Sequence, residues 1–234
     1  MLTDLKEAVY KANMELAKSG LVIMTFGNVS GIDRRKGIVA IKPSGVPYEA
    51  LKADDIVLVD LEGQVVEGWL NPSSDTPTHA EIYKAFPEVG GIAHAHSVYA
   101  TMFAQARREI LCYGTTHADL FHGPVLLTRL LVEPEVAADY ERNTGKVIVE
   151  RFAGLDPLAL PGVLVAGHGP FAWGRTPAEA VETAFVLEQV AKTAFGSLIL
   201  DPRLRPLDGH ILEKHFLRKH GPDAYYGQKK EKDR

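Results

Sequence analysis

The most informative segment of this chain reads Gly90-Gly91-Ile92-Ala93-His94-Ala95-His96-Ser97. The two glycines allow a close backbone approach, and the short apolar run after them predicts a β-strand. Side chains alternate along a strand, so His94 and His96 should point to the same face. Two imidazoles on one face form half of a metal site, and Ala95 leaves room between the rings. The alternative is one buried and one exposed structural histidine; we favour two metal ligands.

A second apolar run, Pro161 to Ala166, ends in Gly167-His168-Gly169. A core histidine needs no glycine on either side, whereas a ligand that reaches a metal from a sharp turn does. We therefore predict His168 as the third ligand, brought from a distant part of the chain.

The composition narrows the class of protein. Of the 234 residues, 46% are hydrophobic and 24% are charged, which is usual for a globular protein. The net charge of −4 argues against a nucleic-acid partner. The single cysteine, Cys112, excludes an intrachain disulfide and fits a reducing compartment. We see neither a signal peptide nor a run of 18 apolar residues, so we expect a cytoplasmic protein without a membrane partner.

Periodicity and capping residues predict the secondary structure. We expect helices at 3–19, 77–86, 98–107, 176–195 and 208–220, and two short helices within 134–153 that are broken near Asn143-Thr144-Gly145. Strands are expected at 21–26, 37–42, 56–60, 64–66, 92–96, 124–128, 161–166 and 171–173, with a tight turn at Gly27-Asn28-Val29-Ser30. We expect one domain over 1–227, followed by a polar, frayed tail at 228–234.

Two polar turns suit an anion such as phosphate. Lys42-Pro43-Ser44-Gly45 offers a cation, a hydroxyl and an unhindered amide. Ser73 and Ser74 precede the expected helix N-terminus at Thr76-Pro77, where free N–H groups and the helix dipole favour negative charge. An ordinary solvated turn is the alternative for the first segment, and helix capping is the alternative for the second.

Two further segments leave their roles open. The stretch from Tyr113 to Asp119 is expected as a loop. It carries His117 and Asp119 together and is either catalytic or solvated. The last helix carries His215, and the aromatic pair Tyr225-Tyr226 follows on a polar end. Such aromatics usually dock on their own subunit or on a neighbouring one.

With these segments placed, the chain resembles the class II aldolase family and, within it, the L-ribulose-5-phosphate 4-epimerases. The motifs that carry the resemblance are Thr25-Phe26-Gly27-Asn28-Val29-Ser30, Lys42-Pro43-Ser44-Gly45, Ser73-Ser74-Asp75-Thr76-Pro77-Thr78-His79, His94-Ala95-His96-Ser97, Gly114-Thr115-Thr116-His117-Ala118-Asp119, Gly167-His168-Gly169-Pro170-Phe171-Ala172-Trp173-Gly174 and the end from Lys214 to Gly227.

The resemblance implies an α/β fold with three α/β/α layers, a largely antiparallel central sheet and a homotetramer with active sites at subunit interfaces. It implies a divalent metal, zinc before manganese or cobalt, held by His94, His96 and His168 with Asp75 as a further ligand. It also implies catalytic roles for Asp119 and Tyr226 across the interface, with His215 assisting. The substrate-binding residues that it implies are Gly27, Asn28, Lys42, Ser44, Gly45, Ser73, Ser74 and Thr116.

The implied substrate is a phosphorylated ketopentose, and its chemistry explains the metal. A proton on C4 is not acidified by the C2 ketone, whereas breaking C3–C4 leaves the electrons in an enediolate that a divalent cation stabilises. We therefore expect L-ribulose 5-phosphate and D-xylulose 5-phosphate to interconvert by retro-aldol cleavage and re-addition.

Other functions of the same family remain open. The nearest is a sugar-phosphate aldolase of the L-fuculose-1-phosphate type, a lyase, in which Glu stands where this chain has Asp75. A non-catalytic adducin-like interaction domain is a second alternative, and it would lack the three histidines. A metal-dependent dehydratase is a third.

Overall fold

The structure, a computed structural model, describes residues 2–227. Its helices are α1 (Leu2–Lys18), α2 (Thr76–Ala85), α3 (Val98–Gln105), α4 (Thr115–Ala118), α5 (Glu133–Arg151), α6 (Pro177–Leu200) and α7 (Gly209–His220), with short 3-10 turns at Tyr48–Ala50 and Ala53–Asp55. Its strands are β1 (Gly27–Asp33), β2 (Ile38–Ile41), β3 (Val57–Asp60), β4 (Val65–Glu67), β5 (Gly91–Ala95), β6 (Leu126–Leu127), β7 (Gly162–Leu164) and β8 (Pro170–Gly174). The polar tail expected at 228–234 lies outside the described residues.

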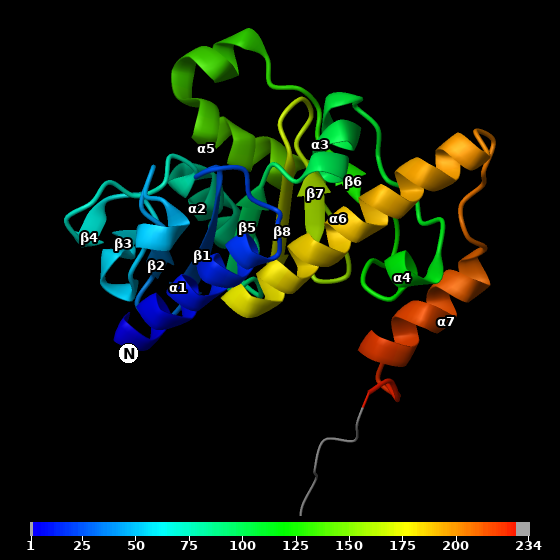
Figure 1. The fold of residues 1–234 in the computed structure, drawn as a ribbon, viewed down its shortest axis with the longest axis horizontal. Helices are drawn as coiled ribbons and strands as arrows, with labels where there is room; N and C mark the ends of the chain where they lie inside the picture. The colour runs from blue at the N-terminus through cyan, green and yellow to red at the C-terminus, as the bar shows by residue number, and fades with distance from the viewer. Residues whose placement is uncertain (1, 228–234) are drawn as a thin grey trace, which may run out of the picture.

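The strands form one sheet in the order β4-β3-β2-β1-β5-β8-β7-β6, which Figure 1 shows at the centre of the molecule. The prediction of a largely antiparallel sheet needs correction, because the sheet is mixed. β6 runs parallel to β7, while the other neighbouring strands pair antiparallel. The chain passes from β6 to β7 through α5, and a crossover of this length is what a parallel pair requires.

Alternate residues of β5 face different hydrophobic clusters. Ala93 and Ala95 pack with residues of α1 and α6, and Figure 1 shows these two helices running along the near face of the sheet. Ile92 points the other way, into the largest cluster, together with residues of α2 and α5. His94 has the same parity as Ile92, so its ring emerges on the α2 and α5 side.

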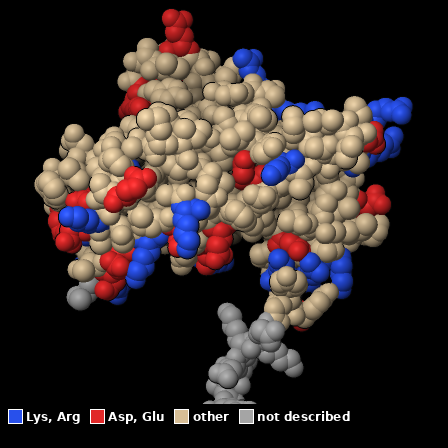
Figure 2. Space-filling model, in the orientation of Figure 1, with Lys and Arg blue, Asp and Glu red and all other residues tan. Residues whose placement is uncertain are grey.

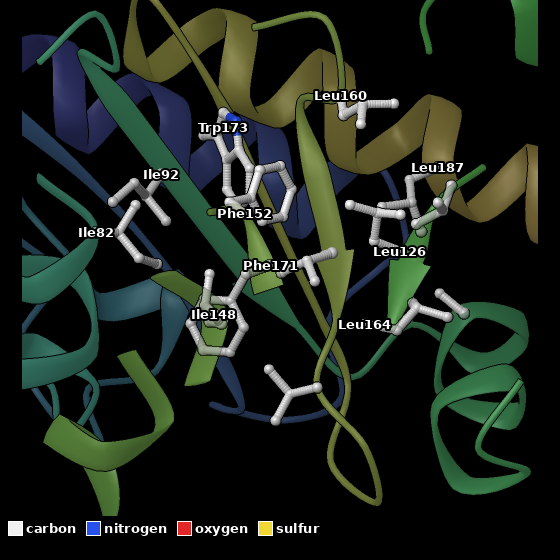
Figure 3. Packing of buried hydrophobic residues seen from close by; sticks show 14 of the residues in the cluster. Ile82, Ile92, Leu126, Ile148, Phe152, Leu160, Leu164, Phe171, Trp173 and Leu187 are labelled. Atoms are coloured by element: carbon white, nitrogen blue, oxygen red, sulfur yellow. The ribbon is translucent and has the colours of Figure 1, made fainter. Parts of the chain in front are cut away.

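Aromatic side chains fill the middle of that largest cluster (Figure 3). The Phe152 ring meets the Trp173 ring edge-on at 5.1 Å between centroids, and Phe86 lies 5.7 Å from Trp173. The Trp173 indole N–H donates to the Pro157 carbonyl at 2.7 Å, so the buried ring leaves its donor satisfied. This packing holds the C-terminal end of α5 against β8.

A row of glycines crosses three neighbouring strands. Gly31 of β1 pairs with Gly91 of β5, which pairs with Gly174 of β8. The first turn of α6 lies directly on this row: an added Cβ would lie 2.7 Å from Pro177 Cγ at Gly31, 2.4 Å from Pro177 N at Gly91 and 2.4 Å from Glu179 Cβ at Gly174. We call Gly31, Gly91 and Gly174 the glycine row. It explains why the sequence places glycine ahead of the two histidines.

The structure corrects two predictions near the N-terminus. Residues 21–26 form no regular strand, and only an isolated bridge joins Ile23 to Phe26. The expected turn at 27–30 instead begins β1, which pairs with both β2 and β5. Gly and Asn favour turns locally, but pairing on both edges in the middle of a sheet overrides that preference.

Two further predictions need correction. The break expected at 143–145 lies at Asp139, which has φ −163° and ψ 85° inside α5. Gly145 is helical because α5 packs closely on α2 there: its added Cβ would lie 2.9 Å from the Thr78 carbonyl oxygen. The polar stretch at 113–119, expected as a loop, contains the short helix α4.

Within the described residues, α6 is long and apolar enough to cross a membrane by length and composition. It packs against α1, α3, β5 and β8, and a buried core helix of this composition passes the same test.

Candidate metal and substrate site

Three elements bring the predicted histidines together. His94 lies in β5, His96 follows directly after that strand, and His168 lies in the turn between β7 and β8. One potential ligand atom from each ring lies within 4.8 Å of the other two. The centroids of the three rings are 4.8 to 5.0 Å apart. Because β5 pairs with β8, the two distant sequence motifs meet at one end of the sheet.

The protonation of the rings suits metal binding. Burial and the neighbouring His94 and His96 lower the pKa of His168 to about 4. Burial and His94 also lower the pKa of His96. Both rings are therefore neutral at physiological pH, as a metal ligand must be. Nε2 of His168 and Nε2 of His96 lie 3.0 Å apart, so these two ring nitrogens face the same point.

The orientation of His94 supplies an independent test of the fit to a metal. Its Nδ1–H donates to the Pro170 carbonyl at 2.9 Å, which leaves Nε2 with its lone pair free. Its ring stacks on the ring of Phe171 at 4.1 Å between centroids, and this contact fixes the ring plane. A backbone carbonyl that orients the second nitrogen is a frequent feature of metal-binding histidines. The donor set of three imidazoles therefore fits a divalent cation.

Asp75 lies beside this cluster rather than within it. Asp75 and the three histidines line one cavity, and the Asp75 carboxylate accepts a hydrogen bond from Asn28 Nδ2 at 2.7 Å. Burial alone would raise the pKa of Asp75, but the charges of His94 and His79 and the Asn28 hydrogen bond hold it below its usual value. A charged carboxylate next to three imidazoles adds the negative charge that a divalent cation attracts.

The two polar turns predicted to hold an anion lie side by side. Ser73 N donates to the Lys42 carbonyl at 3.0 Å, and Ser44 N donates to the Asn71 carbonyl at 2.9 Å. Both turns line one cavity of about 410 Å³ that also contains the histidines. Its lining residues are Thr25, Phe26, Gly27, Asn28, Lys42, Pro43, Ser44, Gly45, Ser73, Ser74, Asp75, His94, His96, Tyr140, Glu141 and His168.

Lys42 supports the first turn from below. Its side chain is 1% exposed, and its ammonium group donates to the Val46 carbonyl at 2.7 Å and lies over the Tyr48 ring. Burial lowers the pKa of Lys42 to about 8. The ammonium group therefore holds Ser44 and Gly45 in place and adds positive potential at the floor of the cavity.

The predicted catalytic residues form a separate cluster around α7. Asp119 accepts from Nε and Nη2 of Arg218, with a shortest distance of 2.7 Å, and from His215 Nδ1 at 3.0 Å. The Tyr226 ring lies under Arg218 and Lys219, where Figure 2 shows Lys and Arg side chains gathered. Burial raises the Asp119 pKa, but these hydrogen bonds and charges hold it below its usual value.

Thr116 lies in α4 close to this second cluster. None of Thr116, Asp119, His215 and Tyr226 lines the cavity that holds the histidines. Within one described chain, the two halves of the predicted site are therefore apart.

Two residues of the cavity lining escaped the sequence analysis. Tyr140 and Glu141 follow the break in α5 at Asp139, and the Tyr140 hydroxyl lies 3.4 Å from His168 Nδ1. Asp139 Oδ1 accepts from Arg142 N at 3.2 Å, so it caps the second half of α5. Asp139 within a polar, helix-forming segment is the one signal that could have located this helix start.

Comparison with known proteins places this fold and site among the class II aldolases. The chain belongs to the family described as Class II Aldolase and Adducin N-terminal domain, which it matches over residues 7–195. The class II aldolases of this family depend on a divalent metal. The clustered histidines His94 and His168 both lie within the matched span.

Similar proteins within this family carry more specific names. L-ribulose-5-phosphate 4-epimerase UlaF of Salmonella paratyphi C is 54% identical over 228 residues, which is 97% of this chain and 100% of that relative. The protein of the same name from Salmonella choleraesuis has the same identity and coverage. A solved L-fuculose 1-phosphate aldolase superposes with a TM-score of 0.77 at 27% identity, covering 91% of this chain and 94% of its own.

Proposed function

We propose that this protein is an L-ribulose-5-phosphate 4-epimerase that interconverts L-ribulose 5-phosphate and D-xylulose 5-phosphate. The observation that carries the proposal is the 54% identity over the full length of relatives with that activity in their names. The site agrees with it, because a carboxylate and three imidazoles share a cavity with two hydroxyl-rich turns.

Different residues of the cavity bind different parts of the substrate. We assign the 5-phosphate to Ser44, Gly45, Ser73 and Ser74, where serine hydroxyl groups and the backbone N–H groups of Gly45 and Ser74 are available, with Lys42 beside the first pair. His94, His96 and His168 would hold the metal with Asp75. A divalent cation there would stabilise negative charge on the oxygens at C2 and C3 as the C3–C4 bond breaks. Gly27 and Asn28 line the wall between the two regions.

Epimerisation needs proton transfer on two opposite faces of the aldehyde. We assign these steps to Asp119 and Tyr226 of a neighbouring subunit, with His215 assisting, because within one chain they do not line the cavity. The lowered pKa of Asp119 keeps its carboxylate ionised and able to accept the C4 hydroxyl proton. Tyr226 is 60% exposed at the chain's described end, so its hydroxyl is available to a neighbour.

The proposal extends to properties that the same family suggests. We propose zinc as the metal, with manganese or cobalt as alternatives, since imidazole and carboxylate ligands suit all three. We propose a homotetramer, because the catalytic cluster needs a neighbouring cavity. We further propose a three-layer α/β/α arrangement for a single domain spanning 1–227, and a cytoplasmic location.

The decisive experiment is product analysis with L-ribulose 5-phosphate and added divalent metal. The proposal predicts D-xylulose 5-phosphate with no net release of smaller fragments. Accumulation of glycolaldehyde phosphate, or cleavage of L-fuculose 1-phosphate at a higher rate, would identify a lyase instead. Asp75→Glu is a matched variant, because it adds one methylene while keeping the charge. We expect it to lower epimerase activity.

A further inference from the structure

Glu188 is a buried carboxylate in the middle of α6 that the proposed chemistry does not use. Its side chain is only 7% exposed. Oε1 accepts from Tyr99 N and Oε2 accepts from Ala100 N, each at 2.9 Å. These two N–H groups belong to the first turn of α3. N–H groups in the first turn of a helix have no carbonyl partner within that helix. Glu188 therefore caps α3 from another helix, 88 residues away in the sequence.

The helix that Glu188 caps joins the two histidine-bearing turns. The N-terminus of α3 follows His96 after one residue, Ser97, whose side chain makes no capping bond. At the other end of α3, the Ala104 carbonyl accepts from Gly167 N at 2.9 Å, directly before His168. α3 thus connects the two histidine-bearing segments: His96 lies next to its first residue, and the His168 turn is hydrogen-bonded near its last.

Further contacts hold α3 against the turn that carries His168. A Cβ added at Gly169 would lie 3.3 Å from His96 Cδ2 and 3.5 Å from Thr101 Oγ1 of α3. The His168 turn therefore packs on both His96 and the middle of α3. A displacement of the first turn of α3 would separate His96 Nε2 from His168 Nε2, which now lie 3.0 Å apart.

We infer that Glu188 is a positioning residue for the metal site: its carboxylate fixes α3 to α6 and so sets the spacing of His96 and His168. This inference rests on the proposed metal site. It predicts that the Glu188 carboxylate affects metal affinity and not only the stability of the fold. By linkage, metal binding should in turn stabilise the first turn of α3.

The test compares Glu188→Gln with Thr176→Ala. A glutamine keeps the size but has one acceptor oxygen, so its NH₂ group faces a backbone N–H and leaves it unpaired. Thr176 Oγ1 accepts from Glu179 N at 3.2 Å at the start of the same helix, and this bond involves no residue of α3. Thr176→Ala therefore removes a helix cap of α6 without touching the bonds between Glu188 and α3. The apo proteins are titrated with zinc against a chelator, and thermal unfolding of each apo protein is recorded.

We expect Glu188→Gln to weaken zinc binding by about tenfold or more, a typical effect of losing a residue that orients ligands. We expect Thr176→Ala to lower the unfolding temperature and leave zinc affinity unchanged. Equal zinc affinity in wild type and Glu188→Gln would overturn the inference and leave Glu188 a stability residue only. Absence of zinc binding by the wild type would instead refute the proposed metal site.

A second measurement needs no variant and covers the case in which Glu188→Gln does not fold. Hydrogen exchange of wild-type protein is compared with and without zinc by mass spectrometry. The inference predicts slower exchange in the peptide 97–105 on zinc binding and little change in the peptide 176–182. Unchanged exchange in 97–105, with zinc bound, would overturn it.

Discussion

Replacing Gly91 with alanine should destabilise the protein, because the first turn of α6 packs directly on the glycine row. The added Cβ would lie 2.4 Å from both Pro177 N and the Thr176 carbonyl oxygen, whereas ordinary contacts begin at 3.4 Å. The first turn of α6 would have to move by about 1 Å. Both opposing atoms belong to the backbone, so rotation of a side chain cannot relieve the contact.

The expected cost follows from these distances. Overpacking in a core costs about 1–3 kcal/mol, and a backbone contact lies at the upper end of that range. The lower chain entropy of unfolded alanine returns about 0.5–1 kcal/mol. A net loss of about 2 kcal/mol results, which corresponds to an unfolding temperature lower by about 4–8 °C in a chain of this size.

Urea unfolding at equal protein concentrations, followed by circular dichroism, measures this difference. Gly196→Ala is the control, because that glycine lies inside α6 with nothing within 4 Å of an added Cβ. It should stabilise the protein by up to about 1 kcal/mol, since alanine is the better helix former. A Gly91→Ala protein within about 0.5 kcal/mol of wild type would refute the role assigned to the glycine row.

Three further predictions concern the site. His96→Ala should abolish retention of zinc after gel filtration and turnover together; an active, metal-replete variant would exclude His96 as a ligand. Ser74→Ala should raise the KM for L-ribulose 5-phosphate several-fold with a smaller change in kcat, because it removes a ground-state phosphate contact; an unchanged KM would remove Ser74 from the phosphate pocket. The pKa of Asp119 in the folded protein is lowered despite its burial, because Arg218 and His215 stabilise the charged carboxylate. The charged carboxylate therefore stabilises the fold at pH values above the ordinary aspartate pKa, and this stability is lost as the pH falls through the folded pKa. The stability difference between wild type and Asp119→Asn, measured by urea unfolding from about pH 6 downwards, should therefore shrink below about pH 4, and a difference independent of pH would contradict the ion pair.

Local signals in the sequence were sufficient for most helices. The expected helix at 3–19 corresponds to α1 (Leu2–Lys18), and the one at 208–220 corresponds to α7 (Gly209–His220). Thr176, the first residue of the expected helix at 176–195, caps α6 by accepting from Glu179 N. Amphipathic spacing and caps are properties of neighbouring residues, so they can be read without knowing the partners of a helix.

The errors arose where distant residues decide the structure. Gly27 and Asn28 favour a turn by themselves, yet the pairing of β1 with β5 makes them part of a strand. Gly145 suggested a break, yet the close packing of α5 on α2 needs a small residue there. The parallel pairing of β6 with β7 depends on the whole α5 connection and leaves no local pattern.

The same distinction applies to the site. The spacing of His94 and His96 and the glycines around His168 were enough to predict a cluster that the structure brings together. Glu188 and Tyr140 gave no signal, because each acts through a contact with a residue far away in the sequence. The catalytic assignment of Asp119 and Tyr226 stays a prediction, since it concerns contacts between subunits.

The glycine row also has a consequence for protein engineering on this scaffold. At Gly91 the opposing atoms of α6 belong to the backbone, so no change of side-chain rotamer can absorb a larger residue there. Libraries aimed at new sugar phosphates should leave the strand crossings under α6 untouched. Diversity is better placed in the turns that line the cavity, where side chains face open space and the helix above the sheet does not depend on them.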